Sequence, residues 1–161
     1  AFRQVQGKCI LKLAGKGSLR GQLEELAGEL GVADRVLFLG RISREEMQKE
    51  MQRASCFVLP SRYEAFGAVL VEAMATGLPV IATRSGGPAH IVAAETGILV
   101  EPEDVSGLAG AMTRMVSAPE VFKSDRIRSL AMERYGERVV MQSFDRLFRQ
   151  IIENQLNHKN D

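Results

Sequence analysis

The fold is decided by residues 57–83, which read FVLPSRYEAFGAVLVEAMATGLPVIAT. This stretch opens with a short apolar run at 57–59 and closes with a second one at 80–83, each bounded by proline, glycine or serine. Between them lies a run of small and apolar residues from about 66 to 76, which is typical of a helix and ends at Gly77. A strand, a helix and a strand in this order predict a crossover between parallel strands.

The same alternation continues on both sides of this stretch. Apolar runs bounded by turn residues predict three more strands, at 9–14, 36–39 and 98–100. Ser43 is followed three residues later by Glu46, which predicts a capping box at the start of another helix. A helix is also predicted by four leucines that share one face at spacings of three and four, namely Leu19, Leu23, Leu26 and Leu30. We therefore predict an α/β fold with a Rossmann-like parallel sheet of about five strands and helices on both faces.

Composition narrows the class of protein and of partner. The 161 residues are 45% hydrophobic and 25% charged, which fits one globular domain. The formal charge of +1 gives no field that favours nucleic acid, so we expect a small-molecule partner. Two cysteines in apolar runs, Cys9 and Cys56, are typical of reduced buried thiols. No apolar run approaches the roughly 20 residues of a transmembrane helix, so we expect a cytoplasmic protein.

The domain boundaries follow from the two ends of the chain. Residues 1–6 read like the tail of a helix, so we expect the domain, residues 1–156, to be incomplete at its N-terminus. Two helices are predicted within 121–154, with a break near Tyr135 and Gly136. The last residues, 157–161, are expected to fray.

The residues with the clearest chemistry are Glu64, Gly67 and Glu72. Gly67 stands where a strand, a turn and a helix N-terminus meet at the carboxyl edge of the predicted sheet, the place where open α/β folds bind ligands. Free backbone N–H groups there suit a diphosphate. Glu64 and Glu72 are eight residues apart, about 12 Å along a helix, and carboxylates on both sides of a diphosphate site can accept hydrogen bonds from sugar hydroxyls. Each glutamate also has a simpler interpretation, Glu64 as a helix-start carboxylate and Glu72 as a solvated helix residue.

The motif and its surroundings resemble glycosyltransferase family 4, retaining enzymes built from two Rossmann-like domains (the GT-B type). The resemblance rests on PSRYEAFG at 60–67 and EAMATGLPVIAT at 72–83, and on LAGKG at 13–17, VLFLGR at 36–41 and TGILV at 96–100. Because it covers nearly the whole chain, it implies the C-terminal, donor-binding half of such an enzyme. The implied activity is metal-independent transfer of a hexose from a UDP- or GDP-linked donor to a glycan or lipid-linked acceptor, with no cofactor. The implied partners are the donor and an N-terminal acceptor-binding domain that this chain lacks, and peripheral association with the inner face of a membrane stays open.

The resemblance also assigns roles to individual residues. It implies that Glu64 lies at the reacting centre and that Glu72 contacts the ribose of the donor. The backbone around Arg41 would meet the base, and no residue would bind a metal. The other implied donor-binding residues are Phe66, Gly67, Ala68, Val69, Gly15, Gly17, Gly86 and Gly87. The glycine pairs, however, suit simple turns equally well.

Two departures from the family pattern stand out. Nothing before Cys9 can supply the Gly-Arg turn and the Lys-Gly pair whose cations bind the diphosphate in the family, so we expect the fragment alone to be inactive. His90 stands where the family commonly has glutamate. The alternatives are a nucleotide-sugar epimerase of the same two-domain class, or a non-enzymatic nucleotide-binding domain of flavodoxin-like topology.

Overall fold

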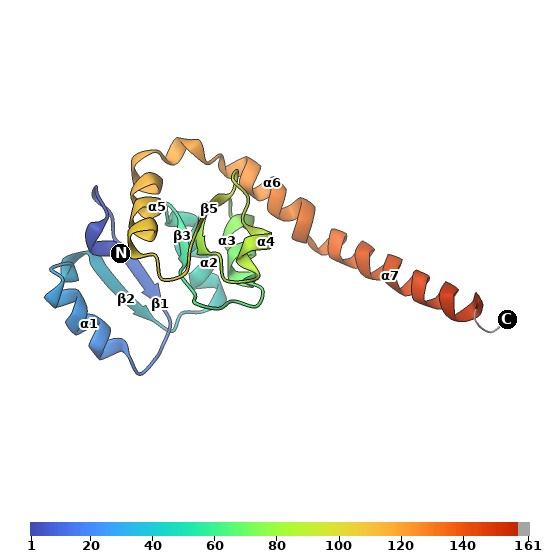
Figure 1. Ribbon diagram of the computed structural model, residues 1–161, viewed down its shortest axis with the longest axis horizontal. Coiled ribbons are helices and arrows are strands. Elements are labelled where there is room, and N and C mark those ends of the chain that lie inside the picture. The colour runs from blue at the N-terminus through green and yellow to red at the C-terminus, as the bar shows by residue number, and fades with distance from the viewer. Residues whose placement is uncertain (158–161) are drawn as a thin grey trace.

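The computed structural model describes residues 1–157, without the side chains of residues 154, 156 and 157. Strands and helices alternate over most of the chain (Figure 1). The strands are β1 (Leu11–Ala14), β2 (Val36–Gly40), β3 (Phe57–Leu59), β4 (Val80–Thr83) and β5 (Gly97–Val100). The α-helices are α1 (Arg20–Glu29), α2 (Arg44–Arg53), α3 (Ala68–Ala75), α4 (Pro88–Ile91), α5 (Val105–Ser117), α6 (Ser124–Tyr135) and α7 (Glu137–Asn157). Three short 3₁₀ helices complete the fold: η1 (Phe2–Gln4), η2 (Ala33–Arg35) and η3 (Pro119–Val121).

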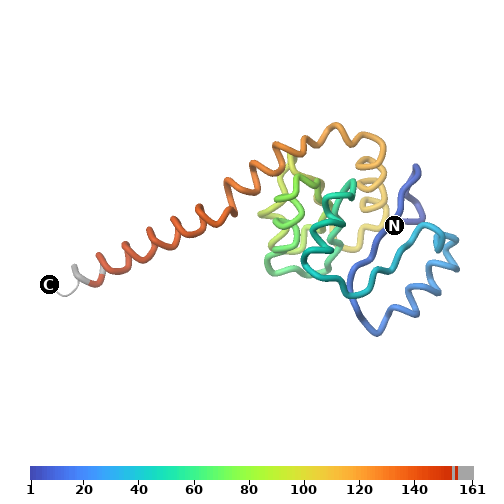
Figure 2. Tube along the Cα trace, turned by 180° about the vertical axis from the view of Figure 1, so that it is seen from behind, coloured from blue at the N-terminus to red at the C-terminus, as the bar shows by residue number. Residues whose placement is uncertain are grey.

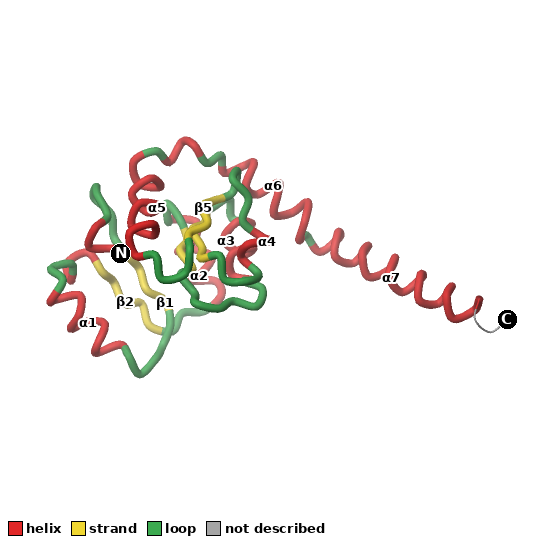
Figure 3. Tube along the Cα trace, in the orientation of Figure 1, coloured by secondary structure: helices red, strands yellow, loops and turns green. Residues whose placement is uncertain are grey.

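All of the strand pairs are parallel, and the predicted α/β class with five strands is confirmed. The five strands nevertheless form two hydrogen-bonded groups and not one continuous sheet: β1 pairs with β2, while β4 lies between β3 and β5. The strands carry few residues each, from three in β3 to five in β2. Figure 3 shows the two groups of strands side by side.

The core is centred on β4, whose four residues are all buried. Both α3 and α5 contact β4, and Figure 1 shows these helices on opposite sides of the three-stranded sheet. Helices therefore cover both faces of the central strand, which is why it is apolar at every position and shows no alternation. The methionines at 51, 112 and 115 are buried in this core.

The predicted break at Tyr135 and Gly136 is confirmed, because α6 ends at Tyr135 and α7 begins at Glu137. Helix α6 packs against α3, whereas α7 extends away from the rest of the molecule (Figures 1 and 2). Side chains of α7 are exposed from Val140 to Glu153. Within the described residues, no helix is both long and apolar enough to cross a bilayer. The predicted tail, residues 157–161, lies outside the described part except for Asn157, the last residue of α7.

The capping box is present as predicted: the Ser43 hydroxyl accepts from the Glu46 N–H at 3.1 Å, and the Glu46 carboxylate accepts from the Ser43 N–H at 2.7 Å. The hydrogen bond from the Ser43 backbone N–H is the largest cause that lowers the pKa of the Glu46 carboxyl below its ordinary value. The start of α2 is therefore fixed by local sequence alone.

The leucine-bearing helix also forms, as α1, but the face that the four leucines share is not covered within the described chain. They are 36–57% exposed, and Ala27 is the buried residue of α1. Periodicity predicts which residues share a face, but it does not say what covers that face. At the N-terminus the predicted helix tail is the single 3₁₀ turn η1.

Candidate functional site

The candidate site lies at the carboxyl ends of the parallel strands. The loop after β3, residues 60–67, lies against the turn after β4, residues 84–87. In Figure 1 the loops after β1 and β3 emerge on the same, lower side of the molecule. This is the edge at which parallel α/β sheets present ligand sites.

The first turn of α3 presents unpaired backbone donors at this edge. Gly67, the N-cap residue, has φ of 92°, a left-handed conformation that glycine adopts without strain. Within residues 1–157, the N–H groups of Gly67, Ala68 and Val69 donate no hydrogen bond to the chain, while Leu70 N–H donates to the Gly67 carbonyl at 2.9 Å. Donors of this kind, at the positive end of a helix dipole, suit an anionic ligand.

Glu64 is half-buried directly beside these donors. One of its carboxylate oxygens, Oε1, accepts from the Phe66 N–H at a long 3.4 Å. A Cβ placed on Gly67 would stand 3.5 Å from Glu64 Cγ, so the side chain turns back over the loop towards the N-cap. Its backbone is fixed by the turn after β4: Glu64 N–H donates to the Ser85 carbonyl, and Gly87 N–H donates to the Glu64 carbonyl, both at 2.9 Å.

Gly86 and Gly87 let the two loops approach each other. Gly86 has φ of 106°, and a Cβ there would stand 2.8 Å from the Glu64 carbonyl oxygen. A Cβ on Gly87 would overlap the backbone of Phe66. The packing of this chain alone accounts for both glycines, so their predicted contact with a donor stays a prediction.

Buried hydroxyl groups support the loop from below, a feature that the sequence analysis missed. Thr83, 3% exposed, donates from Oγ1 to the Ser61 carbonyl and lies 3.1 Å from the hydroxyl of Ser85, which is 7% exposed. Two polar residues at the end of an apolar strand were the available sequence signal.

Glu72 lies on the solvent side of α3. It follows Ala68 by one turn on the same exposed side, whereas Leu70, Ala73 and Met74 face the core. The described residues contain no ion pair to Glu64 or Glu72, and no cluster of three or more His, Cys, Asp or Glu side chains that could hold a metal.

Gly15, Gly17 and Arg41 belong to the other group of strands. Gly15 and Arg41 directly follow β1 and β2, and Gly15 N–H donates to the Gly40 carbonyl at 2.7 Å. Nothing lies within 4 Å of a Cβ placed on Gly15 or Gly17. The backbone of Gly15 nevertheless favours glycine, because its φ is 140°, whereas neither packing nor a positive φ accounts for Gly17. Arg41 is exposed.

Arg20 is a further cation near this edge that the sequence analysis did not single out. Its guanidinium lies 5.7 Å from the centroid of the Phe38 ring, and its Nε pairs with Glu24 at 2.8 Å. A Cβ on Gly40 would stand 3.7 Å from its Nη1. No local motif marks this arginine, because its position depends on how α1 packs beside β2.

His90 is exposed near the end of α4. Its backbone N–H donates to the Gly87 carbonyl at 3.0 Å, which ties α4 to the glycine pair.

A separate cavity lies at the opposite, amino ends of β3 and β4, between Met51, Pro79 and Phe122. The candidate site is thus an open surface at a sheet edge, distinct from that cavity.

Comparisons with known proteins agree with this architecture. Residues 1–134 match the model of the family described as Glycosyl transferases group 1. An uncharacterized glycosyltransferase of Methanocaldococcus jannaschii is 40% identical over 108 residues, which are 66% of this chain and 28% of that protein. The sucrose-phosphate synthase of Thermosynechococcus elongatus is 33% identical with a TM-score of 0.80, over 92% of this chain and 39% of that one.

Anabaena HepE, solved in complex with UDP and glucose, shares the fold with a TM-score of 0.80. It is 24% identical, and the match covers 92% of this chain and 42% of that one. The chain thus spans less than half the length of each of these relatives.

Proposed function

This chain belongs to the group 1 glycosyl transferases, and from that premise we propose that it is the part of a glycosyltransferase that binds a nucleotide-sugar donor. The family assignment supports the class of reaction that we propose for the complete protein, glycosyl transfer. The donor, the stereochemistry and the residues that act are our proposal, supported by the geometry at the start of α3.

One observation carries the proposal: the N–H groups of Gly67, Ala68 and Val69 are unpaired at the start of α3 within the described chain. Glu64 precedes these donors and Glu72 follows them on the exposed side of α3, and neither carboxylate forms an ion pair within the described residues. A nucleoside diphosphate sugar has the matching pattern, with negative charge at its centre and hydroxyl groups on the rings at both ends. The N–H groups would hold the diphosphate, while Glu64 and Glu72 would accept hydrogen bonds from hydroxyls of the sugar and of the ribose.

We propose UDP or GDP as the nucleotide and a hexose as the transferred group, as the resemblance to glycosyltransferase family 4 implies. HepE, a protein of the same fold, was solved with UDP and glucose, which is compatible with this choice. Gly15 and Gly17 would border the donor cleft, and the backbone at Arg41 would meet the base. The acceptor, a glycan or a lipid-linked glycan, would bind to a further domain, and the complete protein would act on the cytoplasmic side, with or without peripheral membrane association.

Catalysis would rest on positioning and electrostatics. The N–H groups at the start of α3 would stabilise the negative charge that grows on the leaving diphosphate, without a metal ion and without a resident cofactor. Glu64 would lie at the reacting sugar without acting as a nucleophile, and transfer would retain the anomeric configuration.

The test is calorimetric titration of the complete protein with UDP and with GDP. Binding of one nucleotide is expected, with an affinity that excess EDTA leaves unchanged. Glu72→Gln should weaken it about tenfold, because a hydrogen bond to a charged acceptor is worth about 1.5–3 kcal/mol. Glu64→Gln should change nucleotide affinity less than about threefold while lowering transfer far more, because the proposed partner of Glu64 is the sugar.

Glu29→Gln is the matched control, an exposed glutamate on α1 away from the site, and should change neither quantity. Absence of nucleotide binding by the wild-type protein, or equal effects of all three substitutions, would contradict the proposal. Retention is tested separately by the anomeric configuration of the first product formed.

A further inference from the structure

Helix α6 reaches the candidate site with its last two residues. The ring of Tyr135 meets the ring of Phe66 edge to face, with centroids 6.2 Å apart and an interplanar angle of 81°. Arg134 donates from Nη2 to the His90 carbonyl at 2.8 Å, and its guanidinium carbon lies 5.3 Å from the centroid of Tyr135. Two consecutive residues thus contact two different segments of the site.

Those two segments are the ones that the site depends on. Phe66 directly precedes Gly67, whose N–H is the first unpaired donor of α3. His90 lies in α4, the short helix that follows the glycine pair, and Gly87 of that pair donates from its N–H to the Glu64 carbonyl. Arg134 and Tyr135 therefore contact, from the outer side, the two segments that form the site. On the inner side, Thr83 of β4 supports the first of these segments through its hydrogen bond to Ser61.

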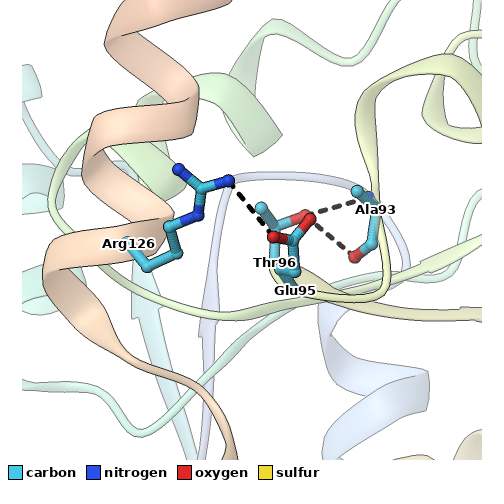
Figure 4. Close-up of polar contacts among 4 residues, drawn as sticks. All are labelled: Ala93, Glu95, Thr96 and Arg126. Carbon is cyan, nitrogen blue, oxygen red and sulfur yellow. Dashed lines mark hydrogen bonds and ion pairs between the residues drawn. The ribbon is translucent and has the colours of Figure 1, made fainter.

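The other parts of α6 are fixed independently. Ile127 and Ala131 are buried against the core, at 0% and 1% exposure. Nearer the start of α6, Arg126 pairs with Glu95 at 3.2 Å (Figure 4). Glu95 belongs to a rigid turn, because the neighbouring Thr96 hydroxyl accepts from the Ala93 N–H at 2.9 Å and donates to the Ala93 carbonyl at 3.1 Å.

Phe66 itself has little other support. Its side chain is 52% exposed, and Tyr135 is its only aromatic partner within residues 1–157. Without that contact the Phe66 ring is free to rotate into solvent, and the backbone that leads to Gly67 loses its outer anchor. An ordered loop requires less ordering when a ligand binds, so such an anchor raises affinity without touching the ligand.

We propose that Arg134 and Tyr135 are positioning residues, which hold two segments, the loop of residues 64–67 and residues 86–90, in the arrangement that receives the donor. This inference rests on the proposed function for its purpose. The claim that α6 orders these two segments does not depend on the proposed function, and hydrogen exchange without ligand measures it separately.

The test uses four variants in the complete protein. Tyr135→Leu removes the aromatic edge, and Tyr135→Phe keeps it. Arg134→Met removes the guanidinium, and Arg128→Met is its matched control, because Arg128 is exposed on α6 with no hydrogen bond or ion pair within the described residues. Amide hydrogen exchange is measured without ligand at Glu64 and Leu70, the residues of the segment 64–70 whose N–H groups donate to backbone carbonyls. The donor KM, the acceptor KM and the thermal midpoint are measured alongside.

We expect Tyr135→Leu and Arg134→Met to speed exchange at Glu64 and Leu70 about tenfold and to raise the donor KM about three- to tenfold. The acceptor KM should not change, Tyr135→Phe should restore wild-type exchange, and Arg128→Met should have no effect. Unchanged exchange at Glu64 and Leu70 in Tyr135→Leu, or an equal rise over the whole chain, overturns the inference. If exchange changes as expected but the wild-type protein binds neither UDP nor GDP, the positioning role stands and the proposed function fails.

Discussion

Two regions of the molecule use the same elements with different results. The core region, residues 57–135, surrounds a central strand whose four residues are all buried. The N-terminal unit, residues 11–40, has two strands and one helix, and Ala27 and Val32 are its buried apolar residues. The same strand–helix–strand pattern is thus well buried where helices cover both faces of a sheet, and buries few apolar residues where they do not.

This difference bears on the candidate site, to which both regions contribute. The core region carries Glu64, the start of α3 and the glycine pair, each fixed by backbone hydrogen bonds or by contacts that leave no room for a Cβ. The N-terminal unit carries Gly15, Gly17 and Arg41, around which there is open space or solvent. We therefore expect the part of the candidate site in the core region to be preformed and the part in the N-terminal unit to be adaptable.

The largest effect on the free energy of unfolding is expected from the substitution of leucine by alanine, made once in each region. Leu70→Ala should lower the free energy of unfolding by about 2–5 kcal/mol, because Leu70 is 0% exposed and its removal leaves a cavity. Leu23→Ala should cost less than about 1 kcal/mol, because Leu23 is 43% exposed in α1. Urea denaturation of both variants measures the difference, and equal losses would mean that the two regions are equally well packed.

Two glycine-to-alanine substitutions, one in each region, sharpen the comparison. Gly97→Ala should cost about 3 kcal/mol, since the added methyl would overlap the Val80 carbonyl between two paired strands. Gly28→Ala should instead stabilise by about 0.5–1 kcal/mol, because it lies inside α1 with nothing within 4 Å of its Cβ. Thermal midpoints that move in opposite directions are the expected result. Two shifts of the same sign would contradict it.

The smallest effect concerns the boundary between the two regions. Burial raises the pKa of the Cys56 thiol from 9.0 to about 11, with a further contribution from Cys9. The folded state therefore keeps a proton that the unfolded state releases above pH 9, so this contribution to stability is complete below pH 9 and is lost as pH rises towards 11. The loss should be about 1 kcal/mol at pH 10.

Urea denaturation at pH 8 and pH 10 tests this for the wild type and for Cys56→Ala. The variant should lose about 1 kcal/mol less than the wild type over that range. Cys9→Ala, the control, should lose nearly as much as the wild type, because Cys9 is only the smaller of the two causes. If the pH dependence of Cys56→Ala matches that of the wild type, the Cys56 thiol is not the group responsible.

Much of the fold was predictable because local signals sufficed. The strand at 80–83, the capping box of Ser43 and Glu46, and the break at Gly136 all depend on neighbouring residues, and each is confirmed. The division of five strands into two hydrogen-bonded groups was not predictable, since pairing depends on residues far apart in the chain.

The candidate site divides in the same way. The turn before α3 is visible in the sequence because a glycine and two glutamates mark it. Arg134 and Tyr135 are invisible there, since nothing in a helical sequence shows that its end will reach Phe66, 69 residues before Tyr135. The predicted roles of Glu64 and Glu72 stay predictions, which the titrations of Glu64→Gln and Glu72→Gln test.

The single residue between α6 and α7 has a mechanical consequence. Gly136 is in an extended conformation, with φ of −61° and ψ of 145°, and the 21-residue helix that follows is about 30 Å long. A change of only 10° in one torsion at Gly136 would sweep the far end of α7 through as much as about 5 Å, by the same rise per residue. The direction in which α7 presents its exposed apolar side chains, Phe144 and Phe148 among them, is thus set by the residue immediately after Tyr135.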